Sequence, residues 1–145
     1  MQNKNTTMSV VIWQRQDMNV IDIKSEIESI EQLEITDRTT ATDASAAMRM
    51  LGDFDRYAIG MACFAGSTPW ERHPEDELLQ ILAGTVNVTI LDDRNRSRQI
   101  TLSAGTMFVV PKGWWHQQHS SAGVKLLFVT SQTGNDHSAT DPRLI

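Results

Sequence analysis

Short apolar runs separated by turn residues recur from Arg56 to Ser131, at the spacing typical of an all-β sandwich or barrel. In the clearest run, Val86, Val88 and Ile90 alternate with polar residues, which predicts a strand with one buried and one solvated face. The expected strands are residues 57–64, 77–82, 85–91, 96–102, 106–110, 115–120 and 124–131. A sheet protein of eight or nine short strands is therefore predicted, with few helices.

The amino-terminal third has weaker signals. Residues 9–14 and 19–23 are rich in Val and Ile and predict two further strands. Residues 24–35 change period, because apolar residues recur every three positions among Glu and Gln, so we expect a short surface helix that covers one end of the barrel. Residues 36–47 predict a connection without a regular element. We expect residues 1–8 to be disordered, and the polar tail 133–145 to lie on the surface or against a second subunit.

Length and composition narrow the function classes. A chain of 145 residues predicts one domain, 1–145, with a core that needs no disulfide. The net charge of −5 argues against a nucleic-acid partner, and no apolar run is long enough to span a membrane. Cys63 is the only cysteine, and the amino terminus lacks the apolar run of a secretion signal. We therefore expect a cytoplasmic protein.

One short segment brings three possible metal ligands together. Glu71 and His73 are two residues apart, so on an extended strand both side chains leave the same face. Glu77 follows after a short turn and shares a predicted strand face with Leu79 and Ile81. An unpaired carboxylate on such a face would cost several kcal/mol, so it needs a cation or hydrogen-bond donors. A metal ion is one such cation.

A second segment supplies another imidazole. His116 follows a turn formed by Pro111, Lys112 and Gly113, about thirty residues further along a chain of predicted strands. Two neutral imidazoles with one or two carboxylates suit a divalent first-row metal with open positions. His73, Glu77 and His116, with Glu71, are the predicted ligands of one divalent transition metal ion, which would be Fe, Mn, Ni or Zn.

The two segments resemble the two motifs of the cupin superfamily, in its small single-domain cupin 2 type. In the first motif, Gly66, His73, Glu77 and Gly84 stand at family positions, with Glu71 in place of the first histidine. In the second, Gly105, Pro111, Gly113 and His116 match, while Ser120 stands where the family has Asn. The resemblance covers about residues 55–131. It implies a double-stranded β-helix or jelly-roll barrel, here with a short amino-terminal helix, and one metal in the barrel pocket.

The carboxylate of Glu71 leaves three alternatives open. It can act as a fourth ligand, and the harder oxygen donor then shifts the preference toward iron or manganese. It can instead pair with an arginine or with substrate, which leaves a face of two histidines and one carboxylate. The substitution can also mark a member of the family that has lost its metal.

Four residues are candidates for a substrate pocket near His116. Strand alternation places Trp114 and Gln118 on the same face as His116, where they would offer an aromatic wall and a hydrogen bond. Leu79 and Ile81 would line the same interior. Trp114 serves equally well as packing, and Trp70 falls on the opposite face from Glu71 and is expected in the core. His119 and His137 have no partner at an informative spacing and are interpreted as solvated.

These residues support two hypotheses of different classes. The first is a metal-dependent enzyme that acts on a small organic substrate, in the manner of a dioxygenase or, with the same ligands, of an isomerase or hydrolase. The second is a non-catalytic module that binds a sugar or metabolite, with or without metal. The family resemblance also implies a homodimer, in which an amino-terminal strand such as 9–14 extends the neighbour's sheet.

Overall fold

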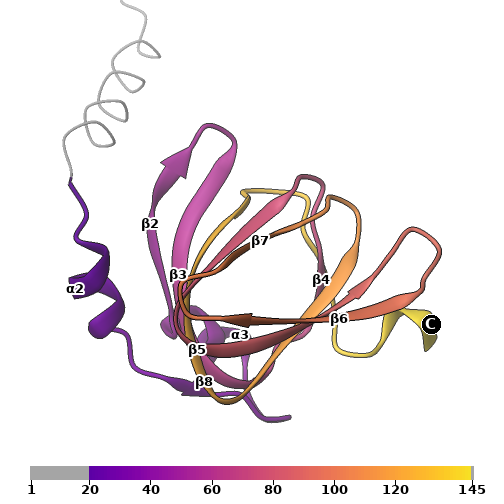
Figure 1. Cartoon of the computed structure of the whole chain (residues 1–145), viewed down its shortest axis with the longest axis horizontal. Coiled ribbons are helices and arrows are strands. Elements are labelled where there is room, and N and C mark those ends of the chain that lie inside the picture. The colour runs from indigo at the N-terminus through magenta and orange to yellow at the C-terminus, as the bar shows by residue number, and fades with distance from the viewer. Residues whose placement is uncertain (1–19, 145) are drawn as a thin grey trace, which may run out of the picture.

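The described part of the chain is residues 20–144 of a computed structural model, and it consists mainly of β-strands (Figure 1). Its elements in chain order are α2 (Ile23–Glu28), β1 (Leu33–Glu34), α3 (Ala41–Ala46), β2 (Met48–Phe54), β3 (Tyr57–Ser67), β4 (Trp70–Arg72), β5 (Glu77–Leu91), β6 (Ser97–Ser103), β7 (Met107–Val110), β8 (Trp115–Ser131), β9 (Asp136–Ser138) and the 3₁₀ helix η1 (Pro142–Leu144). None of the helices described here is long and apolar enough to cross a membrane.

Two long strands, β5 and β8, form the centre of a barrel. They pair antiparallel with each other, and β8 continues the sheet to β3 and β4 while β5 pairs with β6 and β7. Short strands complete the edges, since β1 and β2 pair with β3 and β9 pairs with β4. Figure 1 shows these strands around one interior, with α2 outside it. The all-β barrel prediction is confirmed.

The strand β5 shows how the interior changes along one chain segment. Sequence predicted two strands, 77–82 and 85–91, but the structure has one strand of 15 residues with irregular pairing on β8 around Gly84. An extra residue in a strand flips the faces that follow it. Interior side chains are therefore at odd positions before Gly84 and at even positions after it. Gly84 has φ +78°, and an added Cβ would collide with the carbonyl oxygen of Gly123.

The strand β8 is likewise continuous where two strands, 115–120 and 124–131, were predicted. Ser120, in the position where the family has Asn, is 1% exposed. Its hydroxyl donates to the carbonyl of Thr85 at 2.7 Å and accepts from the backbone N–H of Gly123 at 3.1 Å. Ser120 thus stabilises the irregular region of the β5–β8 pair, and this structural role explains its burial.

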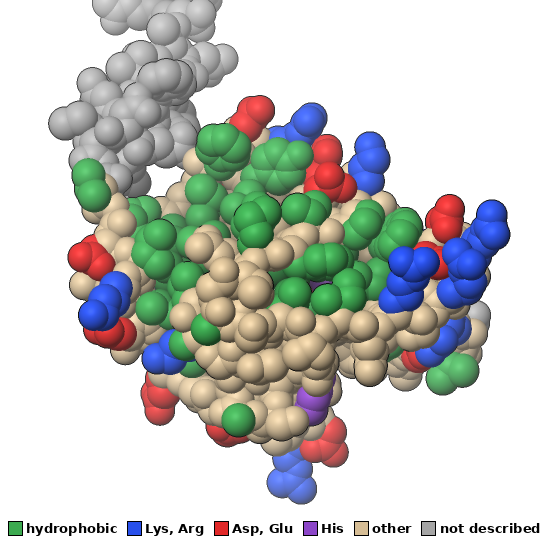
Figure 2. Space-filling model, in the orientation of Figure 1, with side chains coloured by type: hydrophobic (Ala, Val, Ile, Leu, Met, Phe, Trp, Pro, Cys, Tyr) green, Lys and Arg blue, Asp and Glu red, His purple; other side chains and the backbone are tan. Residues whose placement is uncertain are grey.

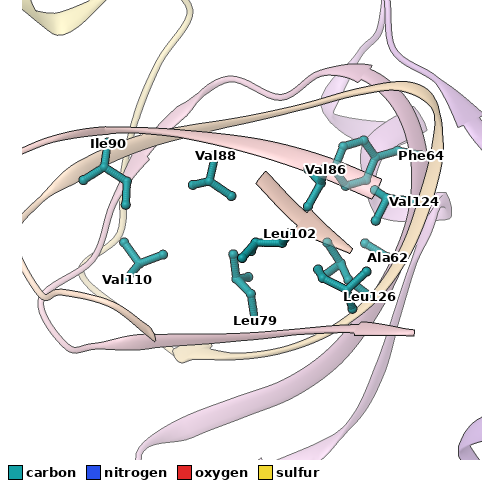
Figure 3. Close-up of a cluster of buried hydrophobic side chains, with 11 residues drawn as sticks. Ala62, Phe64, Leu79, Val86, Val88, Ile90, Leu102, Val110, Val124 and Leu126 are labelled. Carbon is teal, nitrogen blue, oxygen red and sulfur yellow. The ribbon is translucent and has the colours of Figure 1, made fainter. Parts of the chain in front are cut away.

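The barrel interior is filled by one apolar cluster, part of which Figure 3 shows. Its members face inward from five strands: Ala62, Phe64, Leu79, Ile81, Val86, Val88, Ile90, Leu102, Val110, Val124 and Leu126. Gly60 lies beside this cluster, and an added Cβ there would come within 2.5 Å of Phe128.

A second apolar cluster lies on the outer face of β3 and β8. Ile27 and Ile30 pack there against Met61, Cys63 and Leu127. The predicted helix therefore exists, but it is shorter than expected and covers a sheet face and not an end of the barrel. It begins after Asp22, whose side chain accepts from the Ser25 N–H at 3.0 Å, and it ends at Glu28.

Several predictions for the termini need correction. Residues 20–23 were predicted as part of a strand, but 20–22 have no regular structure and Ile23 begins α2. Leu33, assigned by its spacing to the helix, lies in β1. The strand predicted at 9–14 and the disorder predicted at 1–8 fall outside the described residues.

The sequence analysis missed two elements, the helix α3 and the strand β2. Residues 36–47 were predicted to be irregular, yet α3 forms there with a capping box. Thr40 accepts from the Asp43 N–H, and the Asp43 carboxylate accepts from the Thr40 N–H at 2.9 Å. The strand β2 was also not predicted; it forms a hairpin with β3 through Asp55 at φ +56°.

Candidate metal centre

The first part of the centre comes from β4 and the residue after it. Glu71 and His73 project to the same side, as the alternation predicted, and the Glu71 Oε2 to His73 Nε2 distance is 3.6 Å. Trp70 points to the other side and is buried in agreement with the prediction. The carbonyl of His73 accepts from the N–H of Gly113 at 2.8 Å, so the turn before His116 is joined directly to this segment.

Glu77 begins β5 and faces the interior with Leu79 and Ile81, as predicted; all three are at most 4% exposed. Its two carboxylate oxygens contact different histidines. Oε2 lies 3.2 Å from His73 Nε2, and Oε1 lies 3.1 Å from His116 Nε2. Glu77 therefore stands between the two imidazoles.

His116 enters from β8, whose pairing with β4 places it directly opposite Glu71. The His116 ring lies 5.2 Å from the His73 ring, centroid to centroid, and its Nε2 is 3.9 Å from Glu71 Oε2. One ligand atom from each of Glu71, His73, Glu77 and His116 lies within 4.8 Å of the others. The structure thus brings together all four residues predicted as ligands, from segments about forty residues apart.

The donor set fits a divalent metal ion. Two imidazole nitrogens and two carboxylates would neutralise a divalent charge, and this mixture of ligands suits first-row metals. His73 Nε2 is buried and, among the described residues, makes no hydrogen bond of good geometry despite its nearby carboxylates. A lone pair of this nitrogen directed at a metal would satisfy it. Glu71, at 27% side-chain exposure, is the one member of the four that reaches solvent.

In the metal-free cluster, the carboxylates of Glu71 and Glu77 and the imidazole of His73 shift one another's pKa values. Burial would raise the pKa of Glu71, but His137, His73 and His116 lower it to about 2. Burial would lower the pKa of His73, but the carboxylates of Glu71 and Glu77 raise it to about 10. Burial also opposes ionisation of Glu77, and the two histidines more than offset it, so its pKa is lowered. A metal ion must therefore displace a proton from His73.

Of the open alternatives for Glu71, pairing with an arginine finds no support in the described structure. The basic side chains near its carboxylate are those of histidines 73, 116 and 137. The neighbouring Arg72 instead donates to Asp136 through Nε at 3.1 Å and Nη2 at 2.8 Å. Its guanidinium also lies over the Trp115 ring, 4.8 Å from the centroid.

The carboxyl-terminal segment supplies two neighbours of the cluster that sequence reasoning missed. His137 in β9 is paired opposite Glu71, and its Nε2 lies 3.6 Å from Glu71 Oε1. The interpretation of His137 as simply solvated is therefore incomplete, although its side chain is 58% exposed. Asn135, in the turn before β9, contacts His73 Nδ1 through its Oδ1 at 2.8 Å. Because β9 has only three residues, its pairing with β4 left no signal in the sequence.

The expected pocket residues lie on the interior side of the barrel. Leu79 and Ile81 belong to the central cluster, and Trp114 is half-buried and packs against it. Gln118 is 7% exposed, and its Oε1 has no hydrogen-bond partner among the described residues. His119 is exposed and contacts Ser67 Oγ at 2.7 Å, away from the cluster. A surface hollow of about 200 Å³ borders His73 on the side of Pro74, Gly113 and Gly134.

A β-barrel with a buried histidine and carboxylate cluster at one end defines the class of protein. Residues 62–130 match the family model of the cupin domain. On this match, residues 62–130 form a cupin domain of the cupin 2 type, and the fold of the described chain agrees with that of a solved cupin-2 protein. The resemblance drawn from the two motifs is confirmed.

Solved structures with the same fold are similar to this chain at low sequence identity. A cupin-2 domain containing protein from Shewanella frigidimarina is 22% identical, with a TM-score of 0.60 over 78% of this chain and 95% of that one. Protein NMB1881 from Neisseria meningitidis is 19% identical, with a TM-score of 0.60 over 79% and 100%. Hydroquinone 1,2-dioxygenase from Sphingomonas sp. TTNP3, with 4-hydroxybenzoate bound, is 19% identical, with a TM-score of 0.55 over 61% and 66%. No curated protein matches the chain significantly.

Proposed function

We propose that this protein is a metal-dependent cupin enzyme that acts on a small organic substrate, with dioxygenase-type chemistry. One divalent transition metal ion would be held by His73, Glu77, His116 and Glu71. The observation that carries the proposal is the convergence of these four side chains, three of them nearly inaccessible, with ligand atoms within 4.8 Å of one another. The similarity in fold to a hydroquinone dioxygenase is consistent with this reaction class.

At such a site, different residues would bind the metal and orient the substrate. A bound divalent ion would supply Lewis acidity and, for iron or manganese, electron transfer to oxygen. Glu77 holds the two imidazoles on either side of its carboxylate, and the interior packing keeps water from these three groups. Glu71, at 27% side-chain exposure, is the one of the four that a small substrate would reach from solvent. Gln118 and Trp114 would orient the substrate, because one offers an unpartnered acceptor and the other an aromatic face.

The test is the metal content of protein purified without chelator, followed by oxygen consumption with small carboxylic acids and phenols. We expect about one iron or manganese ion per chain, and oxygen uptake that depends on both metal and substrate. The enzyme proposal would be refuted if the purified protein held no transition metal and consumed no oxygen after it was loaded with iron or manganese.

A non-catalytic module that binds a sugar or metabolite is the second candidate, and one observation favours it. Part of the carboxylate charge is already balanced without metal, because the raised pKa of His73 places an imidazolium beside the ionised Glu71 and Glu77. A thermal-shift titration with iron, manganese, nickel and zinc separates the two candidates, since a ligand that binds only the folded state raises the midpoint. A flat response to all four metals favours the module.

The proposal includes a homodimer in the cytoplasm. Within the described residues β2 pairs only with β3, so one edge of it is open. Exposed apolar side chains lie on β2 and on β7, and Figure 2 shows hydrophobic side chains across the face in view. They are Met48, Met50, Phe54, Met107 and Val109. A second copy would cover the edge and these side chains. Light scattering should give twice the chain mass, and a monomer at micromolar concentration would contradict the dimer.

A further inference from the structure

The two histidines of the cluster are held differently. His116 Nδ1 is buried without a hydrogen-bond partner among the described residues, and the ring is oriented through Nε2 by Glu77. His73 has a partner on the opposite nitrogen, because its Nδ1 lies 2.8 Å from Asn135 Oδ1. Only His73 thus has its far side fixed by another side chain.

The orientation of the Asn135 amide follows from its second contact. Its Nδ2 donates to the backbone carbonyl of Ser131 at 2.9 Å. If the amide were turned over, Oδ1 would face that carbonyl, and two acceptors would oppose each other. The Ser131 carbonyl therefore directs Asn135 Oδ1 toward His73.

The Oδ1 of Asn135 can only accept a hydrogen bond, so it determines whether the ring nitrogen that faces it is protonated. His73 Nδ1 must carry the hydrogen of this bond, so the lone pair of the neutral ring is on Nε2. Nε2 is the atom that lies near Glu77 and Glu71, at 3.2 and 3.6 Å. A backbone carbonyl thus sets, through one amide, which nitrogen is offered to the centre.

The pairing of β9 with β4 holds Asn135 in this place. Arg72 is paired opposite Asp136 and forms an ion pair with it at 2.8 Å, directly after Asn135. Gly134, with φ +79°, makes the turn before it. Asn135 lies beyond the segment 62–130 that matches the cupin domain, so the contact is made by this chain's own carboxyl-terminal segment.

We propose that Asn135 is a positioning residue that holds His73 in the Nδ1–H tautomer, with Nε2 directed at the metal. This inference rests on the proposed metal function and adds a residue from outside the cupin motifs. Hydrogen-bond partners of ligating histidines typically contribute about 10- to 100-fold in metal affinity. Removal of the Asn135 acceptor should therefore weaken metal binding, although Asn135 does not touch the metal.

The experiment compares Asn135→Leu and Asn135→Asp with the wild-type protein, with zinc as a diamagnetic probe. Leu removes both contacts, and zinc affinity should fall about 10- to 100-fold. Asp keeps the acceptor for His73 but loses the donor to Ser131, so its affinity should stay within about threefold of wild type or rise. If Asn135 only ordered the loop, Asp would weaken binding as much as Leu, and the proposal would be wrong.

Gln132→Ala is the matched control. Gln132 fixes the same stretch of chain through bonds to the carbonyls of Asp55 and Tyr57 at 3.3 and 3.1 Å, but it has no contact with His73. Zinc affinity should be unchanged in this variant. A loss equal to that of Asn135→Leu would show that loop order, and not the tautomer, controls the site.

Nitrogen-15 NMR of the histidine rings tests the tautomer in the zinc-bound protein and the Nδ1–H hydrogen bond to Asn135 in the metal-free protein, even if a variant fails to fold. In the wild-type protein the His73 Nδ1–H should be protected from exchange with or without zinc, and zinc should ligate Nε2. Zinc on Nδ1, or an exchanging Nδ1–H in the metal-free protein, would overturn the proposal. The metal-free measurement is independent of the proposed function, which would fail separately if wild-type protein bound no divalent metal.

Discussion

The two ends of the barrel interior hold opposite kinds of side chain, although the same two long strands build both. At one end, β5 and β8 contribute Val86 and Val124, beside Phe64 from β3 (Figure 3). At the other end they contribute Glu77 and His116. Figure 3 shows Ile90 and Val110 at this second end, and they are the strand partners of His116 and Glu77.

The difference between the ends shows where stability and chemistry lie. Burial of a large aliphatic side chain stabilises the fold by about 1.5–3 kcal/mol, so the apolar end contributes to folding without metal. The polar end is arranged only because β4 and β9 join the barrel there and add Glu71, His73 and their partners. Substitutions at the polar end should therefore act mainly on metal affinity, and those at the apolar positions on stability.

The largest expected effect is that of Glu77→Gln. Gln has nearly the same shape but cannot ionise, so the centre loses an anionic ligand between two imidazoles. Metal affinity should fall by more than about 100-fold, beyond the effect of a typical hydrogen-bond partner of a ligand. Competition titration with a chelating dye measures it. Wild-type affinity in a folded Gln variant would exclude Glu77 as a ligand.

Leu79 lies on the same strand face as Glu77, two residues further along, and Leu79→Ala should have the opposite effect: it should lower stability and leave metal affinity nearly unchanged. Leu79 is 1% exposed in the apolar cluster, so its truncation should lower the free energy of unfolding by about 3 kcal/mol through a cavity. Metal affinity should change little. Chemical denaturation of the metal-free protein and the same dye titration give the two numbers. A greater loss of metal affinity than in Glu77→Gln would invalidate the contrast between the two ends.

A dependence on pH should follow from the polar end alone. His73, with its pKa raised to about 10, carries a proton that the metal must displace. Metal affinity should therefore fall about tenfold for each pH unit below 10. The stability of the metal-free protein should depend on pH in the opposite direction to the metal affinity. The raised pKa stabilises the fold fully below pH 6.5, and this contribution is lost as pH rises toward 10.

Titrations of zinc at pH 6, 7 and 8, with thermal unfolding of the metal-free protein from pH 6 to 10, check both parts. Leu79→Ala is the control, because its loss of stability should be the same at every pH. An affinity for zinc that does not vary with pH would show that no proton leaves the site on binding.

The smallest effect is expected for His137→Gln, at the solvent side of the polar end. His137 is 58% exposed and 3.6 Å from Glu71, so water screens most of its charge. The pKa of Glu71 should rise, since His137 is the first of the groups that lower it, while metal affinity should change by less than about threefold. Calorimetric titration at pH 7 measures this. A larger loss would place His137 among the ligands.

Period-two alternation and the spacing of the motif residues were sufficient to predict the barrel and the four clustered side chains. The alternation placed Glu77 with Leu79 and Ile81, and it placed Trp70 opposite Glu71, because successive side chains of a strand must leave opposite faces. Local signals near the amino terminus were misinterpreted where tertiary contacts decide the structure. Leu33 continues the spacing of Ile27 and Ile30, yet parallel pairing with β3 makes it part of a strand.

By itself, the sequence determined which residues could be ligands and on which strand face each lies, since that depends on local geometry. Only the tertiary structure decided that β9 pairs with β4, and so that Asn135 and His137 reach His73 and Glu71. Pairing between segments about 65 residues apart depends on the assembled barrel, because a three-residue strand has no local preference strong enough to select its partner. The residues that orient His73 and lower the pKa of Glu71 could therefore be identified only from the folded structure.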